Sequence, residues 1–179
     1  GHKVGETISL YTSGSSFIGG TNKNGFVISD YDDGIDDLAS YEGMGSAPKR
    51  FDVTNPSGLF ELNQGNQTKV EANIKYRVTL HIYVTSWNGN LYITNGSAQF
   101  IQFPDATVQA AGYHALTAEF TAGADFDYLC LYSGTNTASG SFYVGNISVE
   151  VLELPKTTTS AGHKVGETIS LYTSGSSFI

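Results

Sequence analysis

Residues 77–85 show the clearest pattern in the chain, a strict alternation of apolar and polar side chains. A period of two places alternate side chains on opposite faces of a β-strand. The apolar set is expected to face a core, and the polar set to face away from it. The apolar positions are Val78, Leu80, Ile82 and Val84, and the polar positions are Arg77, Thr79, His81, Tyr83 and Thr85.

Similar short segments recur along the chain, separated by dipeptides that are typical of turns. Asn88-Gly89 predicts a hairpin leading into residues 91–93, and Asn95-Gly96 supplies a second turn. No stretch keeps the helical period of 3.6, although residues 35–41 suit one helical turn. So many short strands indicate an all-β fold, a two-sheet antiparallel β-sandwich. The other predicted strands are Glu6–Thr12, Phe26–Ser29, Gly58–Leu62, Ala98–Phe103, His114–Thr121, Tyr128–Tyr132 and Ser141–Leu152.

The chain contains an exact internal repeat, because residues 1–18 and 162–179 both read GHKVGETISLYTSGSSFI. Repeats at a fixed offset are typical of tandem arrays. We therefore divide the chain into an N-terminal strand segment (1–18), a β-sandwich (19–154), a Pro/Thr linker (155–161) and the start of a second copy (162–179). A natural array explains this arrangement, and so does an engineered fusion of the N-terminal strand to the C-terminus. Residues 157–161 favour the array, because they do not look like a laboratory linker.

Three segments resemble a known family. Residues 70–84 (VEANIKYRVTLHIYV), 112–122 (GYHALTAEFTA) and 142–149 (FYVGNISV) are similar to strands of carbohydrate-binding jelly-roll modules. The resemblance covers residues 58–152 and implies a jelly-roll β-sandwich. Such modules occur as sugar binders, as phage and tail-fibre decorations, and as spacers in large surface proteins. Gly145 stands where the family has an aspartate, so this chain departs from the calcium site that the aspartate helps to build.

Composition and charge exclude several classes of partner. Nine Lys and Arg against 17 Asp and Glu give a net charge of −8, which disfavours nucleic acid and anionic membrane surfaces. No apolar run is long enough for a membrane span. No signal peptide is recognisable, so we expect any export signal to lie outside this stretch. The single Cys130 has no partner for an internal disulfide and is expected to be a buried, small apolar residue.

Residues 30–37 form the strongest cluster of charge. Five carboxylates within eight residues repel one another unless they are solvated or neutralised, and a hard cation with oxygen ligands would neutralise them. The spacing does not fit an EF-hand loop. The alternatives are therefore a Ca²⁺ site and a solvated acidic loop. The candidate ligands are Asp30, Asp32, Asp33, Asp36 and Asp37.

A second group of residues suits sugars, which bind to aromatic rings and to side chains that hydrogen-bond hydroxyl groups. The only tryptophan, Trp87, precedes Asn88 in a predicted loop, and Tyr83 and Tyr92 lie on outward faces of predicted strands. The alternative is that these rings cover the ends of the sandwich or fill a contact between subunits. The sequons at Asn66 and Asn95 are candidate glycosylation sites in a secreted protein.

Catalytic motifs are not recognisable in the sequence. It shows no nucleophile elbow, no His-Glu-x-x-His, no phosphate-binding glycine loop and no pair of Cys and His. Outside the repeated segment the histidines are His81 and His114, both in predicted strands. We therefore do not expect an enzyme.

The sequence favours a structural repeat module of an extracellular filament, adhesin stalk or fibre, linked head to tail to copies of itself. Strand addition between neighbours would use the second copy as a donor strand; alternatively, that copy simply begins the next repeat. A second hypothesis is a carbohydrate-binding module repeated for avidity, with cell-surface or matrix glycans as partners. Both roles place the protein outside the cell or at its surface. The predicted inter-module strand is Thr168, Ile169, Ser170, Leu171 and Tyr172.

Overall fold

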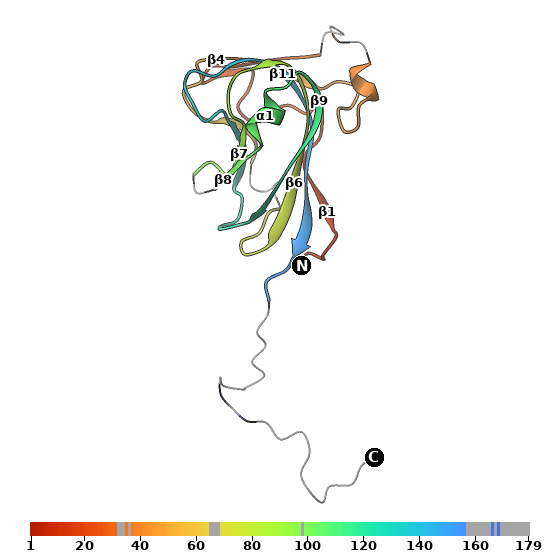
Figure 1. Ribbon diagram of the computed structural model, residues 1–179, viewed down its shortest axis with the longest axis vertical. Coiled ribbons are helices and arrows are strands. Elements are labelled where there is room, and N and C mark those ends of the chain that lie inside the picture. The colour runs from red at the N-terminus through yellow and green to blue at the C-terminus, as the bar shows by residue number, and fades with distance from the viewer. Residues whose placement is uncertain are drawn as a thin grey trace, which may run out of the picture.

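Two antiparallel β-sheets pack face to face in a computed structural model that describes residues 1–31, 35, 37–64, 69–97, 99–156, 166 and 168 (Figure 1). The larger sheet has seven strands in the order β2-β3-β4-β11-β6-β9, with β1 beside β11. These strands are β1 (Thr7–Tyr11), β2 (Asn22–Lys23), β3 (Phe26–Ser29), β4 (Lys49–Thr54), β6 (Lys75–Trp87), β9 (Gly112–Thr121) and β11 (Ser139–Glu153). The smaller sheet has the order β5-β10-β7-β8, made of β5 (Phe60–Gln64), β10 (Tyr128–Tyr132), β7 (Tyr92–Thr94) and β8 (Phe100–Gln102).

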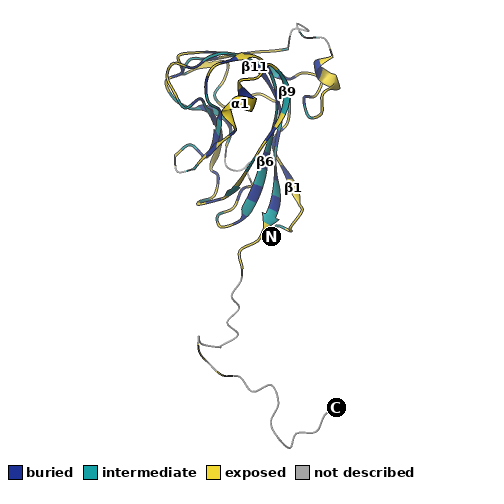
Figure 2. Cartoon of the chain, viewed as in Figure 1, coloured by how far each residue is buried: buried dark blue, intermediate teal, exposed yellow. Residues whose placement is uncertain are grey.

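Alternation along β6 builds the core, as the sequence predicts. Val78, Leu80 and Ile82 are fully buried and face the smaller sheet, whereas the residues between them are partly exposed (Figure 2). Aromatic rings fill the space between the sheets. Phe51 from β4 stacks on Phe142 from β11, with ring centroids 5.3 Å apart, and meets Phe60 from β5 at 5.4 Å. The predicted two-sheet β-sandwich is confirmed.

The prediction of a hairpin at Asn88-Gly89 is wrong. β6 pairs with β9 and β11, whereas β7 pairs with β8 and β10, so this turn carries the chain from one sheet to the other. The carboxamide oxygen of Asn88 accepts a hydrogen bond of 2.6 Å from the Ser139 N–H, which ties the turn to β11. The second turn, at Asn95-Gly96, does join a hairpin, formed by β7 and β8.

Some elements escaped the sequence prediction. They are β2, β4 and the short helix α1 (Asp105–Val108). β4 begins with two cations, and its alternation is short. The expected helical turn in residues 35–41 is present as a 3-10 helix over Leu38–Ser40. Within the part of the chain described, no helix has the length and apolar character needed to cross a membrane.

The segment 38–45 covers part of the outer face of the larger sheet. Leu38 and Met44 are fully buried there against Tyr143, which points outward from β11. β11 has an irregular register between Val144 and Ile147, and the Asn146 N–H donates a hydrogen bond of 2.7 Å to the Gly43 carbonyl. A Cβ added to Gly145 would lie 2.5 Å from that carbonyl oxygen. The glycine that departs from the family pattern therefore stands where neighbouring main chain leaves no room for a side chain.

Candidate functional site

Three aromatic side chains gather on the outer face of the smaller sheet. Tyr92, Phe100 and Tyr132 come from the adjacent strands β7, β8 and β10. The Tyr92 and Tyr132 rings are 5.6 Å apart, and Phe100 lies 5.4 Å from Tyr132 and 6.3 Å from Tyr92. Phe100 is 46% exposed, and both tyrosines are partly exposed. We call these three residues the aromatic trio.

Alternation within each strand explains why the trio faces outward. Ile93, Ile101 and Leu131 point into the core and are nearly or fully buried, so their neighbours along the strands point away from it. Tyr132 is paired directly with Tyr92 across the β10–β7 ladder. Cross-strand aromatic pairs of this kind hold one another in place. The trio is therefore a preformed surface on rigid strands.

Two hollows adjoin β10 on this face. One has a volume of 650 Å³ and is lined by residues 56–58, Tyr132 and residues 134–136. The other has a volume of 410 Å³ and is lined by Leu59, Glu61, residues 95–97, Asp127, Tyr128 and Cys130. The linings include consecutive residues, Gly58 and Leu59, so the hollows follow one another along β5 and β10. Tyr132 belongs to both the first hollow and the trio.

Two carboxylates, Glu61 and Asp127, border the second hollow. Glu61 is held by an ion pair of 2.6 Å with Lys23, and Asp127 is exposed. Cys130 lies beneath the 95–97 turn, where a Cβ on Gly96 would be 4.0 Å from its Sγ. Burial raises the pKa of the Cys130 thiol to about 11, so this thiol stays protonated at neutral pH. It is an inert, buried residue, as the sequence predicts.

This arrangement suits a flat ligand that has an apolar face and hydroxyl groups at its edges. Aromatic rings offer extended apolar area at little entropic cost. The carboxylate oxygens of Glu61 and Asp127, which border the second hollow, can accept hydrogen bonds from hydroxyls. With open hollows along β5 and β10, the face suits an extended molecule better than a small enclosed one.

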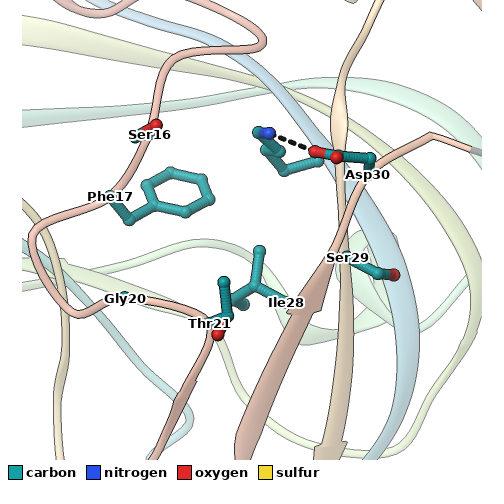
Figure 3. Close-up of a pocket in the computed structure, with 8 residues that line it drawn as sticks. Ser16, Phe17, Gly20, Thr21, Ile28, Ser29 and Asp30 are labelled. Atoms are coloured by element: carbon teal, nitrogen blue, oxygen red, sulfur yellow. Dashed lines mark hydrogen bonds and ion pairs between the residues drawn. The ribbon is translucent and has the colours of Figure 1, made fainter.

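A smaller pocket lies at the edge of the larger sheet (Figure 3). It has a volume of 200 Å³, and Phe17 and Ile28 supply its apolar part. Asp30 and Lys49 form an ion pair at its rim. Because Phe17 and Ile28 are 8% and 7% exposed, the pocket offers little apolar surface to a ligand.

The acidic segment is only partly described. Asp30 pairs with Lys49, and Asp37 is exposed with a φ of 60° before the 3-10 helix. Asp32, Asp33 and Asp36 lie outside the described residues. No group of three His, Cys, Asp or Glu suited to a metal ion occurs among the residues that the structure describes. A Ca²⁺ site at this segment stays a prediction.

The structure separates the predicted sugar-binding residues. Trp87 is 6% exposed and packs edge-on against Phe142 at 5.2 Å, so its ring offers no platform to a ligand. The sequence predicts Trp87 in a loop, whereas Trp87 is the last residue of the core strand β6. Tyr83 is on the outer face of the larger sheet, 5.7 Å from Tyr41, on the opposite side of the sandwich from Tyr92. Asn88 is exposed but engaged with Ser139.

The predicted glycosylation and donor-strand residues have different outcomes. Asn95 is 7% exposed, and its carboxamide oxygen accepts hydrogen bonds from the backbone N–H of Ser97 and Gln99. The folded domain therefore buries the side chain that a glycan would have to join. Asn66 lies outside the described residues, as do Ile169, Ser170, Leu171 and Tyr172. Thr168 is described and is exposed.

Two members of the trio, Phe100 and Tyr132, were missed by sequence reasoning. Each lies in a predicted strand, and the alternation in 128–132 (YLCLY) and 100–102 (FIQ) places them opposite the apolar residues. The signal was therefore present in the pattern. What the pattern lacks is the pairing of β10 with β7, which brings residues 40 positions apart into contact.

The sequence matches no family profile and no curated protein sequence. Among solved structures, the fold is similar to the CBM22-1 xylan-binding domain of Xyn10C from Paenibacillus barcinonensis, with a TM-score of 0.51 and 12% identity over 86% of this chain and 99% of that chain. It is also similar to the CBM22-1 and GH10 modules of endo-1,4-beta-D-xylanase 10B from Clostridium thermocellum, solved with xylohexaose, with a TM-score of 0.50 and 10% identity over 82% of this chain and 28% of that chain. The predicted likeness to carbohydrate-binding jelly-roll modules is confirmed at the level of the fold.

Proposed function

We propose that this chain is a glycan-binding module and that the outer face of the smaller sheet is its binding surface. The observation that carries the proposal is the aromatic trio, with Phe100 46% exposed, beside two hollows along β5 and β10. A cluster of exposed apolar groups on a folded domain often marks an interaction site. Stacking against the apolar faces of sugar rings is one such interaction.

The charge of the chain points to a neutral glycan. At a net charge of −8, the protein repels polyanions at long range. The groups that border the second hollow include Glu61 and Asp127, which accept hydrogen bonds from hydroxyls but repel carboxylates. A neutral polysaccharide therefore fits better than a uronate-rich one. The two similar solved structures are described as a xylan-binding domain and as a module pair with xylohexaose, which makes xylan the first polymer to try.

Binding is tested by calorimetry with soluble xylan, with polygalacturonate as the anionic comparison. Tyr132→Ala and Phe100→Ala each remove one ring, and each should weaken binding by about 1–2 kcal/mol, which is about 5- to 30-fold in Kd. Tyr41→Ala is the matched control, because Tyr41 is a 37% exposed aromatic residue on the other side of the sandwich. Equal affinity of all three variants would refute the assignment of the face, and binding of polygalacturonate alone would refute the neutral glycan.

A second candidate function is a repeat module of an extracellular filament or stalk, in which copies of the chain are each other's partners. The observation that favours it is the exact duplication of residues 1–18 at 162–179. The two functions are compatible, since a repeated binding module gains avidity. Either role places the module outside the cell or at its surface.

A further inference from the structure

The strand β1 lies along the free edge of β11. β11 is longer than its neighbour β4, which pairs only with residues 139–144. β1 pairs antiparallel with the rest of that edge, with Thr7 opposite Glu150 and Ser9 opposite Ser148. The Gly5 N–H extends the contact by a hydrogen bond of 2.8 Å to the Val151 carbonyl. Without β1, the backbone groups along this edge would lack a strand partner, and we call the edge the β1 slot.

The segment that fills the slot also closes one side of the sandwich. Leu10 and Tyr11 are 2% exposed, and Phe17 packs against Phe51 at 5.2 Å and Phe60 at 5.6 Å. Directly after the segment, the Gly19 N–H donates to the Glu61 carbonyl of the smaller sheet at 2.9 Å. Residues 1–18 thus supply a strand to one sheet and core side chains between both.

The second copy carries the same groups in the same order. Residues 168–172 read TISLY, as residues 7–11 do, and Phe178 corresponds to Phe17. Since the sequences are identical, the contacts available in the slot are identical too. Only the connection to the rest of the chain differs between the two copies.

The direction of β11 lets the second copy reach the slot from its own chain. β11 ends beside the N-terminus, at the same end of the sandwich (Figure 1). A chain that leaves β11 there and turns back runs antiparallel to it, with the polarity that β1 has. Gly166, the counterpart of Gly5, would then lie beside Val151, and the chain between the end of β11 and Gly166, residues 154–165, would form the turn. Closing a turn of this length costs little more than closing a shorter one.

We infer that the β1 slot accepts either of the two identical strands of the chain, residues 7–11 or residues 168–172. The second strand enters as a hairpin partner of β11 when the first is displaced. The strand outside the slot is then available to the slot of a second copy of this chain, by main-chain pairing of the kind used in strand addition. This inference stands apart from glycan binding, because it concerns the edge of the other sheet.

Disulfide trapping in the full chain tests the inference. Opposed residues of an antiparallel pair lie within the range of a disulfide, so Ser9→Cys with Ser148→Cys is the positive control for β1. The test variant combines Leu10→Asp, which disables the first strand, with Ser148→Cys and Ser170→Cys. Oxidation should give a cross-linked monomer in most molecules. No cross-link, or cross-linked dimers alone, would overturn entry of the second strand from the same chain. Cys130 adds little background because it is 1% exposed.

Thermal unfolding of full-length variants gives an independent readout. Leu171→Asp alone should leave the Tm unchanged, and Leu10→Asp alone should lower it slightly, because the second strand replaces the first. The double variant should lose about 10 °C more than Leu10→Asp, since a buried leucine is then missing from either strand. Ser9→Asp, at an exposed position on β1, is the control. A Tm of Leu10→Asp as low as that of the double variant would contradict the inference; if the double variant does not fold, the trapping experiment decides.

Discussion

Gly145 offers a sharp test of how the segment 38–45 is held on the larger sheet. Replacing it by alanine adds a single methyl group in the middle of β11. That Cβ would lie 2.5 Å from the Gly43 carbonyl oxygen and 2.9 Å from the Met44 Cα. Both are backbone atoms, so no flexible side chain can swing away, and the whole segment has to move.

The expected loss of stability follows from these contacts. Forcing a methylene-sized group into a packed region costs about 1–3 kcal/mol, and the lower backbone entropy of alanine in the unfolded chain returns about 0.4–1 kcal/mol. Gly145→Ala should therefore destabilise the domain by about 1–2 kcal/mol. Full release of the segment, with exposure of Leu38 and Met44, would cost about 3–6 kcal/mol and sets the upper limit. For a domain of this size, about 1–2 kcal/mol corresponds to a fall in Tm of about 2–8 °C.

Calorimetry measures the change in Tm, and hydrogen exchange shows which part of the domain is destabilised. The Asn146 N–H donates to the Gly43 carbonyl at 2.7 Å, so its exchange should accelerate in Gly145→Ala. Gly123→Ala is the matched control, because the nearest atom to its Cβ, the side-chain oxygen of Gln99, is 3.8 Å away. If Gly145→Ala melts with the wild type and keeps the Asn146 amide protected, the steric reasoning is refuted.

Two further predictions concern the partly buried His81 and the buried Trp87. Burial lowers the pKa of His81, against a weaker opposite effect of Glu42, so the unfolded chain binds this proton more readily and stability should fall as the pH drops below about 6.5. Melting curves between pH 7 and 5 should show a smaller loss for His81→Gln; an equal loss would rule out this histidine as the cause. Trp87→Ala should cost about 3–5 kcal/mol, and Trp87→Phe less, because the buried Nε1 of Trp87 has no hydrogen-bond partner among the described residues. Xylan affinity of Trp87→Phe should equal that of the wild type in calorimetry, and a loss above about fivefold would return Trp87 to the binding surface.

Strand positions were readable from the sequence wherever alternation was long or the ends were marked by turns. β3 and β10 have the predicted bounds, and β6 and β11 extend beyond theirs by a few residues. β4 was not predicted because its outward positions carry Arg50 and Asp52, which form an ion pair of 3.1 Å, so the strand has only two core residues, Phe51 and Val53. The pairing of the strands was harder to predict than their positions, because a turn dipeptide such as Asn88-Gly89 does not specify whether the next strand belongs to the same sheet.

Only part of the candidate site could be predicted from the sequence, for a related reason. Tyr92 was recognised as outward-facing, and it is a member of the aromatic trio. Trp87 is the only tryptophan and stands beside a turn, which makes it a candidate for sugar binding. It is nevertheless buried, because it lies on the inward face of β6. Phe100 and Tyr132 carry the same alternation signal as Tyr92, but a single strand does not reveal its neighbours. Composition and alternation predict which residues face outward. Which of these residues meet to form the site depends on contacts between strands that are distant in the sequence.

The two outer faces of the sandwich differ in what covers them, and this difference argues for the smaller sheet as the binding surface. On the larger sheet, Leu38 and Met44 bury the outward Tyr143, and Arg77 at the far end is paired with Glu119 and Glu150. Tyr143 and Arg77 are thus already engaged within the domain. On the smaller sheet the rings of the trio contact one another, Phe100 is 46% exposed, and both tyrosines are partly exposed. A surface that is rigid, apolar and uncovered is the one on which a ligand gains most from burial.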